Sequence, residues 1–291
     1  MFDGFRQGRH ETGMANIAYV TGGDGPPVLL LHGFPQTKAM WARIAPQLAQ
    51  THTVVAADLR GYGDSSKPVN GPDCGNYCFR AMADDMVSLM LSLGHETFHL
   101  VGHDRGGRTA HRLALDHPAR VGTLTVMDII PTRTVFAEGG PKTAHAYYHW
   151  YFLAQPHPFP ETMIGHDPDL FFENCLSGWG PDGLTAFDGE QLAEYRRCWR
   201  DPDAIRAMCA DYRAAWLVDW PMDESGRDSR IACPVHVLYG AEGLMAKQFD
   251  VPAEWRRCCD EVTGQAMPGG HFFPDTAPDA TATAIIEFLS R

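Results

Sequence analysis

Five short apolar runs, rich in β-branched residues, recur along the 291-residue chain. They span residues 28–31, 53–57, 98–101, 124–127 and 235–238. The apolar residues are continuous within each run rather than alternating, which is typical of strands that are covered on both faces. Helical patterns lie between the runs: Met82, Met86, Leu89 and Leu93 share one face, and Gly94 follows as a C′ glycine. Alternating strands and helices predict an α/β fold with a doubly wound, mostly parallel sheet.

This alternation breaks after residue 131 and returns near residue 231. The interval 132–230 is rich in aromatic residues and offers no convincing buried strand. We interpret it as a helical cap inserted into a core domain formed by 1–131 and 231–291. A second, independent domain is the alternative, although linker-like composition is missing at both joins.

Composition and charge narrow the classes of partner. Charged residues make up 21% of the chain and hydrophobic residues 44%, and no apolar run approaches the roughly 18 residues that span a bilayer. A formal net charge of -12 without a Lys/Arg-rich run argues against nucleic acid and anionic membranes as partners. An anionic substrate would need a few cations placed close to it, because the bulk field is screened beyond about 8–10 Å.

The first residues lack the basic stretch, apolar stretch and cleavage site of a secretory signal, so we expect a cytoplasmic location. The eight cysteines show no paired C-x-x-C spacing, which makes a zinc site or a disulfide scaffold a poor interpretation. We expect reduced thiols, no metal site and no cofactor.

One motif points directly to chemistry. The segment Gly102-His103-Asp104-Arg105-Gly106 follows a predicted strand and opens a helix. It has the form of the G-x-S-x-G nucleophile elbow, with aspartate in place of serine. The glycines allow a sharp strand-to-helix turn, so that Asp104 would project at the carboxyl edge of the sheet. An ordinary N-cap aspartate is the alternative, and three further matches decide against it.

Two of these matches are loops where this fold carries its oxyanion hole and its base. His32-Gly33-Phe34-Pro35 follows the first long strand, and the Phe34 N–H would form half of an oxyanion hole, with the Arg105 N–H as the other half. We expect His32 itself to be structural. Gly269-Gly270-His271 places a histidine in a glycine-supported loop before the last helix, where this fold carries its base.

The acid that orients His271 has two candidates. Many relatives carry it three residues beyond the glycine that ends the next strand, but Gly243 occupies that position here. Asp128, at the carboxyl end of the run 124–127, lies at the same sheet edge. We prefer Asp128 to Glu242.

An aspartate nucleophile suits displacement at a saturated carbon and forms an ester with the substrate. His271 would then activate a water molecule to attack the carboxyl carbon of Asp104, and the oxyanion hole would stabilise charge on the enzyme's own group. This chemistry serves two main tasks, the removal of halide and the opening of epoxides.

The residues after the nucleophile favour an anionic substrate. Arg105 and Arg108 stand at i and i+3 and share a helix face, and guanidinium groups bind carboxylates through paired hydrogen bonds. A salt-bridged helix surface is the alternative, but the position beside Asp104 favours substrate binding. Arg112 lies further along the helix and is expected to be structural.

The leaving halide needs hydrogen-bond donors of its own. In the cap, His149 and Trp150 offer ring N–H groups and Tyr212 offers a phenol. Packing within the cap is the alternative for each of these side chains.

At this point the chain closely resembles the fluoroacetate dehalogenases, a branch of the α/β-hydrolase superfamily, over essentially its whole length. The resemblance rests on the segments 32–36, 58–63, 102–106, 128–132, 149–153, 211–214 and 269–272. It implies an α/β-hydrolase fold without a cofactor and, commonly, a homodimer. The residues with implied roles are Asp104 as nucleophile, His271 as base, Asp128 as its orienter, Arg105 and Arg108 for the substrate carboxylate, and His149, Trp150 and Tyr212 for the halide.

We therefore predict a hydrolytic dehalogenase that converts small 2-halo carboxylates, such as fluoroacetate or chloroacetate, to glycolate and halide. An epoxide hydrolase is the nearest alternative, but it would leave Arg105 and Arg108 without a role. A haloalkane dehalogenase for neutral substrates would want an apolar or indole side chain in place of Arg105. A non-catalytic ligand receptor would tolerate loss of the nucleophile or the base, and both are present.

Overall fold

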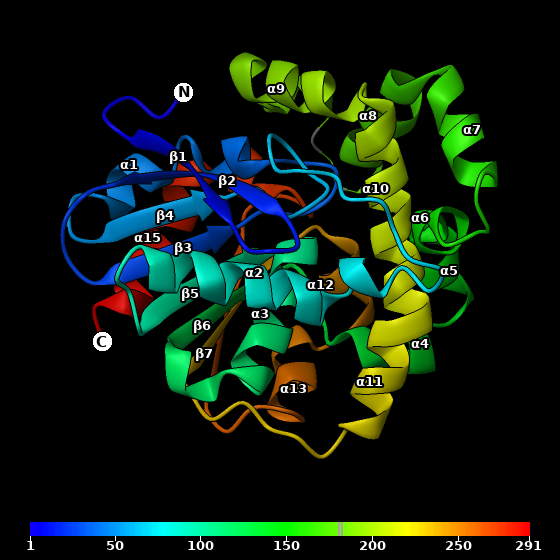
Figure 1. Ribbon diagram of the computed structural model, residues 1–291. Helices are drawn as coiled ribbons and strands as arrows, with labels where there is room; N and C mark the ends of the chain where they lie inside the picture. Colours follow the sequence, from blue (N-terminus) through cyan, green and yellow to red (C-terminus); the bar gives the residue numbers. More distant parts are fainter. Residues whose placement is uncertain (180, 182) are drawn as a thin grey trace.

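The computed structural model describes residues 1–179, 181 and 183–291. Within these residues, an eight-stranded sheet with the order β1-β2-β4-β3-β5-β6-β7-β8 forms the centre of the molecule (Figure 1). Strand β2 pairs antiparallel with β1 and β4, and the remaining neighbours are parallel. The strands are β1 (Arg6–Glu11), β2 (Asn16–Gly22), β3 (Pro27–Leu31), β4 (Thr53–Ala57), β5 (Phe98–His103), β6 (Val121–Met127), β7 (Val235–Gly240) and β8 (Val262–Met267).

The five apolar runs of the sequence form β3 to β7, which confirms the predicted parallel sheet. Three strands were not anticipated. Strands β1 and β8 lie at the two edges of the sheet and are largely exposed, and β2 is only partly buried. Strands that are not covered on both faces carry no continuous apolar run, so this signal missed them.

Helices cover both faces of the sheet. The helices α2 and α3 pack against each other on one face, and α1 and α15 pack together on the other (Figure 1). The predicted apolar face of α2 is buried, and Gly94 follows its end with φ +85°. The core helices are α1 (Ala45–Leu48), α2 (Phe79–Ser92), α3 (Asp104–Asp116), α12 (Leu244–Gln248), α13 (Val251–Arg256), α14 (Phe273–Thr276) and α15 (Pro278–Leu289), with short turns η1 (Lys38–Trp41), η2 (Gly75–Tyr77) and η3 (Pro118–Arg120).

Every regular element described between β6 and β7 is helical, in agreement with the expected cap. These elements lie beside the carboxyl ends of the strands, coloured green to yellow in Figure 1. They are α4 (Thr132–Glu138), α5 (Pro141–Ala146), α6 (Tyr148–Leu153), α7 (Phe159–His166), α8 (Pro168–Gly178), η4 (Leu184–Ala186), α9 (Gly189–Trp199), α10 (Pro202–Ala214), the π-helix η5 (Ala215–Asp219) and α11 (Trp220–Ser225). The domain boundaries at 131/132 and 230/231 stay a prediction. None of the described helices has the length and apolarity that a membrane crossing requires.

Candidate active site

The nucleophile elbow is formed where β5 passes directly into α3. Asp104, the first residue of α3, has φ +44°, a conformation that is strained for a residue with a side chain. A Cβ atom on Gly102 would meet the Gly106 carbonyl, and one on Gly106 would meet the His32 carbonyl. The turn therefore needs glycine at both positions, and it presents Asp104 at the carboxyl edge of the sheet.

The carboxylate of Asp104 accepts a backbone hydrogen bond at the position predicted for the oxyanion hole. The Phe34 N–H donates to Asp104 Oδ2 at 3.0 Å. The Arg105 N–H lies in the first turn of α3, where a helix supplies no acceptor of its own. Burial raises the pKa of Asp104, but the positive charges of His271 and Arg108 outweigh it and hold the pKa at about 2. Asp104 is therefore ionised at neutral pH, as a nucleophile must be.

His271 lies in the loop after β8 and is oriented by Asp128. Its Nδ1 donates to Asp128 Oδ2 at 2.7 Å, and Asp128 Oδ1 accepts the Gly240 N–H at 2.9 Å. With the proton on Nδ1, Nε2 is the basic nitrogen. Burial lowers the pKa of His271, but the bond to Asp128 and the charges of Asp128 and Asp104 outweigh it, so the pKa lies above its usual 6.5.

The structure brings Asp128 to His271 and leaves Glu242 exposed. A Cβ atom placed on Gly243 would lie 3.4 Å from Asp128 Oδ1. Position 243 therefore lies directly beside the carboxylate of Asp128. Two different strand ends can therefore orient the same histidine, and here the end of β6 does so.

The two arginines after the nucleophile are held differently, although both are buried. Arg105 Nε donates to Asp211 Oδ2 at 2.9 Å, and its Nη2 donates to Asp211 Oδ1 and, at 3.0 Å, to the Asp211 carbonyl. The Tyr62 hydroxyl also donates to Asp211 Oδ2, at 2.6 Å. In the described part of the chain only Nη1 of this guanidinium lacks a partner. Asp211 therefore neutralises much of the charge of Arg105.

Arg108 faces no such counterion. Its Nη1 donates to the Ile130 carbonyl and to Thr132 Oγ1, each at 3.0 Å, while Nε has no partner among the described residues. Burial lowers the pKa of Arg108 to about 10 although the charge of Asp104 raises it, so the group stays protonated at neutral pH. Of the two arginines, Arg108 is therefore the one whose charge is not already engaged in an ion pair and can pair with an anionic substrate.

The pair of Arg105 and Asp211 leads to a stability prediction. Replacing Asp211 with alanine should lower the free energy of unfolding by about 3–5 kcal/mol, because it leaves a buried guanidinium without its counterion. Tyr62→Phe is the matched control: it removes one hydrogen bond to the same carboxylate and should cost about 1.5–3 kcal/mol. Urea unfolding measures both, and a smaller loss for Asp211→Ala than for Tyr62→Phe would contradict this account.

A small cavity collects most of these groups. Its volume is about 10 Å³, room for the centre of about one water molecule. It is lined by Asp104, Arg108, Asp128, Ile129, Tyr147, His149, Trp150, Trp179 and His271. Larger cavities of about 260 and 380 Å³ lie elsewhere, away from Asp104. The site is thus built for a very small substrate, which must displace some lining side chains to bind.

The predicted halide donors lie together on the cap side of this cavity. Within the described residues, His149 Nδ1 and the Tyr212 hydroxyl are buried without a hydrogen-bond partner. The ring of Tyr212 lies 5.7 Å from that of His149 and 6.0 Å from that of Trp150. Burial lowers the pKa of His149 and raises the pKa of Tyr212, so both are neutral. His149 and Trp150 line the cavity directly, whereas Tyr212 packs against them.

Three residues of the site were not assigned a role from the sequence. Tyr147 and Trp179 line the cavity, and Asp211 holds Arg105. Aromatic residues are so frequent in the cap that pattern alone could not separate the first two from its core. His32 and Arg112 are structural, as expected: His32 bonds to Gly33 and Leu59, and Arg112 pairs with Asp116. The described residues contain no cluster of three or more His, Cys, Asp or Glu side chains suited to a metal ion.

Comparison with known proteins agrees with this geometry. A family model described as alpha/beta hydrolase fold matches residues 26–278. A curated fluoroacetate dehalogenase from Burkholderia sp is 54% identical over 290 residues, which cover 100% of this chain and 95% of the relative. A soluble epoxide hydrolase from Corynebacterium sp. (strain C12) is 31% identical over 290 residues and 97% of each protein.

Solved structures show the same relationship. ALR0039 from Nostoc sp PCC 7120, described as an alpha/beta hydrolase, has a TM-score of 0.98 at 50% identity, with complete coverage of both chains. The epoxide hydrolase CorEH has a TM-score of 0.89 at 29% identity, and the match covers 98% of this chain and 99% of CorEH. The sheet, the elbow and the full-length similarity together place the chain in the α/β-hydrolase fold family and, within it, in the family of the fluoroacetate dehalogenases.

Proposed function

We propose that this enzyme is a hydrolytic dehalogenase that converts small 2-halo carboxylates, such as fluoroacetate or chloroacetate, to glycolate and halide. The observation that carries the proposal is Arg108, a buried cation that forms no ion pair with the described residues and lines the same cavity as the ionised Asp104. A carboxylate bound to Arg108 would hold the adjacent carbon of a two-carbon acid near the nucleophile. The relative that is 54% identical and carries the name fluoroacetate dehalogenase supports the same reaction.

In the first step, a carboxylate oxygen of Asp104 attacks the carbon that bears the halogen. Because Oδ2 is held by the Phe34 N–H, Oδ1 is the oxygen that is free to form the new bond. The C–O bond forms as the carbon–halogen bond breaks, and the halide leaves toward His149, Trp150 and Tyr212. A neutral imidazole, an indole and a phenol each donate one hydrogen bond to an anion without bringing a competing acceptor charge.

In the second step, water hydrolyses the ester on Asp104. Nε2 of His271 takes a proton from the water, whose oxygen attacks Cγ of Asp104. The charge that develops on Oδ2 is stabilised by the N–H groups of Phe34 and Arg105. The ester bond then breaks, the alcohol oxygen of glycolate takes the proton of the newly formed Asp104 carboxyl group, and Asp104 returns to its carboxylate form. His271 releases its proton to solvent.

Halide release tests the overall reaction. Fluoroacetate or chloroacetate incubated with the protein should yield glycolate and free halide in equal amounts, measured with a halide electrode and by chromatography. Asp104→Asn, which removes the nucleophilic oxygen pair, is the control and should release nothing above the buffer rate. No release by the unaltered protein from either acid would refute the proposed function.

The pH dependence of ester hydrolysis should follow His271. The base must be neutral, so the single-turnover rate should rise with pH as His271 loses its proton, and a raised pKa places that rise at higher pH. Asp128→Asn removes the negative charge that helps to raise this pKa and weakens the hydrogen bond, so it should move the rise to lower pH. Glu242→Gln is the matched control and should leave the profile in place. An unmoved profile in Asp128→Asn would show that another group controls the step.

The epoxide hydrolase alternative is favoured by one observation, since Tyr147 lines the cavity and Tyr212 packs close by, and enzymes of that type use two cap tyrosines as acids. Arg108 argues against a neutral substrate, because a buried cation that forms no ion pair is costly. Styrene oxide incubated under the same conditions should therefore give no diol. Diol formation faster than halide release would reverse the assignment.

We also propose a homodimer, as the resemblance implies, and a cytoplasmic location, which suits a chain whose eight cysteines are all free. Sedimentation equilibrium should give twice the chain mass of 32.2 kDa, and cell fractionation should recover the halide-releasing activity with the cytoplasm. A monomer mass would remove the first of these proposals, and activity in an exported fraction would remove the second.

A further inference from the structure

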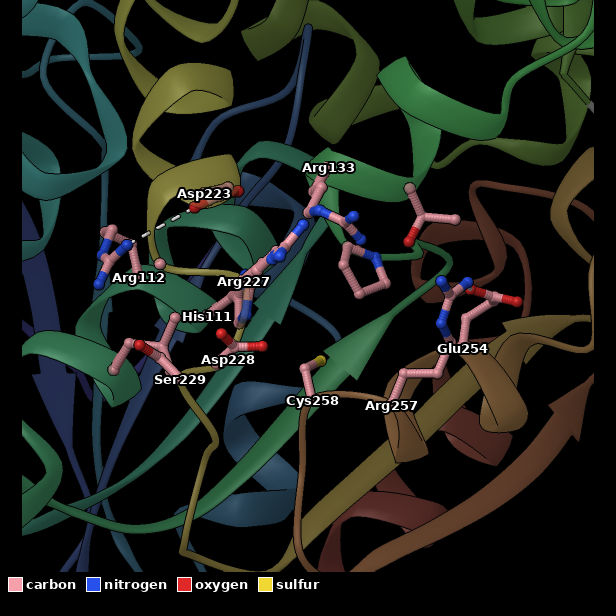
Figure 2. A pocket seen from close by; sticks show the side chains of 14 residues that line it. His111, Arg112, Arg133, Asp223, Arg227, Asp228, Ser229, Glu254, Arg257 and Cys258 are labelled. Carbon is pink, nitrogen blue, oxygen red and sulfur yellow. Dashed lines mark hydrogen bonds and ion pairs between the residues drawn. The ribbon is translucent and has the colours of Figure 1, made fainter.

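A cavity of about 260 Å³ lies apart from the hydrolytic site (Figure 2). Its walls come from α3, from α4 and the residue before it, from α11 and the residues after it, and from α13 and the two residues after it. Two of the lining side chains, His111 and Cys258, combine a base with a nucleophile. Nothing in the hydrolytic mechanism uses either residue, so their pairing calls for its own explanation.

His111 contributes a buried nitrogen. The side chain is 7% exposed, and its ring packs edge-on against Trp255 with centroids 5.2 Å apart. In the described part of the chain, Nε2 is buried without a partner in hydrogen-bond geometry. A buried nitrogen without a hydrogen-bond partner costs folding free energy, so this nitrogen is well suited to accept a proton from a neighbouring group. Cys258 is such a neighbour, because His111 helps to lower the pKa of its thiol.

Cys258 is a half-buried thiol whose sulfur points into the cavity (Figure 2). Its Sγ lies 3.5 Å from the Trp255 carbonyl and 4.0 Å from Cys259 Sγ. The resting thiol donates weakly to the carbonyl, and the Cys259 thiol is placed to donate to Cys258. That donation is the main reason why the pKa of Cys258 lies below its usual value, and His111 and Arg230 act in the same direction against burial.

The remaining cysteines offer a built-in comparison, since all eight are free. Cys233 is also half-buried, but burial raises its pKa to about 11. Burial likewise raises the pKa of Cys175 and Cys209, which are fully buried. Cys258 is thus set apart from these thiols both by its position on a cavity wall and by its neighbours.

Charges around this cavity are close to balance. Its lining includes Arg112, Arg133, Arg227 and Arg257 together with Asp223, Asp228 and Glu254. The arginines are engaged with carboxylates, as with Arg133 and Glu224 at 2.7 Å, and Arg112 and Asp223 at 3.5 Å. The cavity therefore has no strong preference for the charge of a ligand, and small neutral and anionic reagents should both enter.

We propose that Cys258 is a second nucleophile of this chain and a covalent modification site for small haloacetyl electrophiles. Cys258 Sγ attacks the CH₂ carbon, an S–C bond forms, the carbon–halogen bond breaks, and halide leaves into the cavity. The thiol proton passes to Nε2 of His111. The reaction needs no oxidant or cofactor, and it ends with a stable thioether because, unlike an ester, a thioether has no carbonyl carbon for water to attack.

Competitive labelling of the native protein tests this proposal. The protein is treated with a limiting amount of iodoacetamide at neutral pH, and the modified peptides are quantified by mass spectrometry. Cys258 should be labelled at least about tenfold faster than Cys233, since each unit of lower thiol pKa gives about tenfold more thiolate. Labelling of Cys258 no faster than Cys233, or only after unfolding, would overturn the proposal.

Two variants separate the contribution of His111 from exposure alone. His111→Gln should slow labelling of Cys258 several-fold without changing Cys233, and Cys258→Ser should remove the fast-labelled peptide. The urea midpoint of each variant verifies that it is folded. Equal labelling rates in His111→Gln and the unaltered chain would remove the base from the scheme.

A last experiment extends the test to a carboxylate reagent and separates labelling of Cys258 from hydrolytic turnover. Bromoacetate is used with Asp104→Asn, in which the hydrolytic nucleophile is absent. Carboxymethylation of Cys258 in this variant should proceed at least about tenfold faster than carboxymethylation of Cys233 in the same sample. This result does not depend on dehalogenase activity and would stand even if the proposed function failed. If Cys258 stays unlabelled while the unaltered protein releases halide normally, only the proposal of a second nucleophile is rejected.

Discussion

Replacing His271 with asparagine should leave the protein esterified on Asp104 after a single encounter with substrate. The first step needs only the ionised carboxylate, whose pKa of about 2 is set by burial opposed by nearby cations, of which Arg108 is unaffected by the change. The second step loses its base, and steady-state turnover should fall by about 10²–10⁴-fold. Intact-protein mass spectrometry should show an added carboxymethyl group, mapped to the peptide that contains Asp104.

Asp104→Asn with the same substrate is the control for this adduct and should remain unmodified at position 104. The site of attachment matters, because carboxymethylation of Cys258 would add the same mass. Absence of an adduct on Asp104 in His271→Asn, together with lost turnover, would contradict the two-step scheme.

Arg108→Leu should cause the second large loss. Arg108 lines the cavity and has no counterion in the described structure, so the substrate carboxylate is expected to provide one. Removing one partner of a buried charge pair costs about 2–5 kcal/mol, equivalent to roughly 30- to 4000-fold in kcat/KM. Initial rates of halide release over a range of fluoroacetate concentrations measure this loss.

Arg112→Leu is the matched control for Arg108→Leu. It lies one helical turn further along α3 and pairs with Asp116, outside the small cavity. Its kcat/KM should stay within a few-fold of the unaltered protein. If the two variants lost activity equally, the charge of the helix as a whole rather than contact with substrate would account for the effect.

The parts of the fold that could be predicted from the sequence are those where burial produces an unbroken run of apolar residues. Strands β3 to β7 are covered on both faces and carry unbroken apolar runs, whereas β1 and β8 lie at exposed edges and lack them. The cap could be predicted because the alternation of apolar runs and helical patterns stops between residues 131 and 231. Its individual helices could not be placed by the same reasoning, because its aromatic residues are spread over nearly all of them.

The site was predictable where chemistry depends on neighbouring positions in the chain. The elbow around Asp104 and the loop with Phe34 are local motifs, and the structure joins them with the hydrogen bond from the Phe34 N–H. Asp211 is 106 positions away from Arg105, so no local sequence pattern predicts their ion pair. The different ion-pair partners of Arg105 and Arg108 likewise follow only from which carboxylates the fold brings near them.

The narrowness of the hydrolytic cavity also imposes an order on events. A space of about 10 Å³ leaves room for about one water molecule when empty, so little solvent can accompany a bound acid. We expect the hydrolytic water to enter only after the halide has left, because a cavity of this size has no room for both. Halide release would then precede the entry of water, and a larger halide that stays longer in the cavity would delay the release of glycolate.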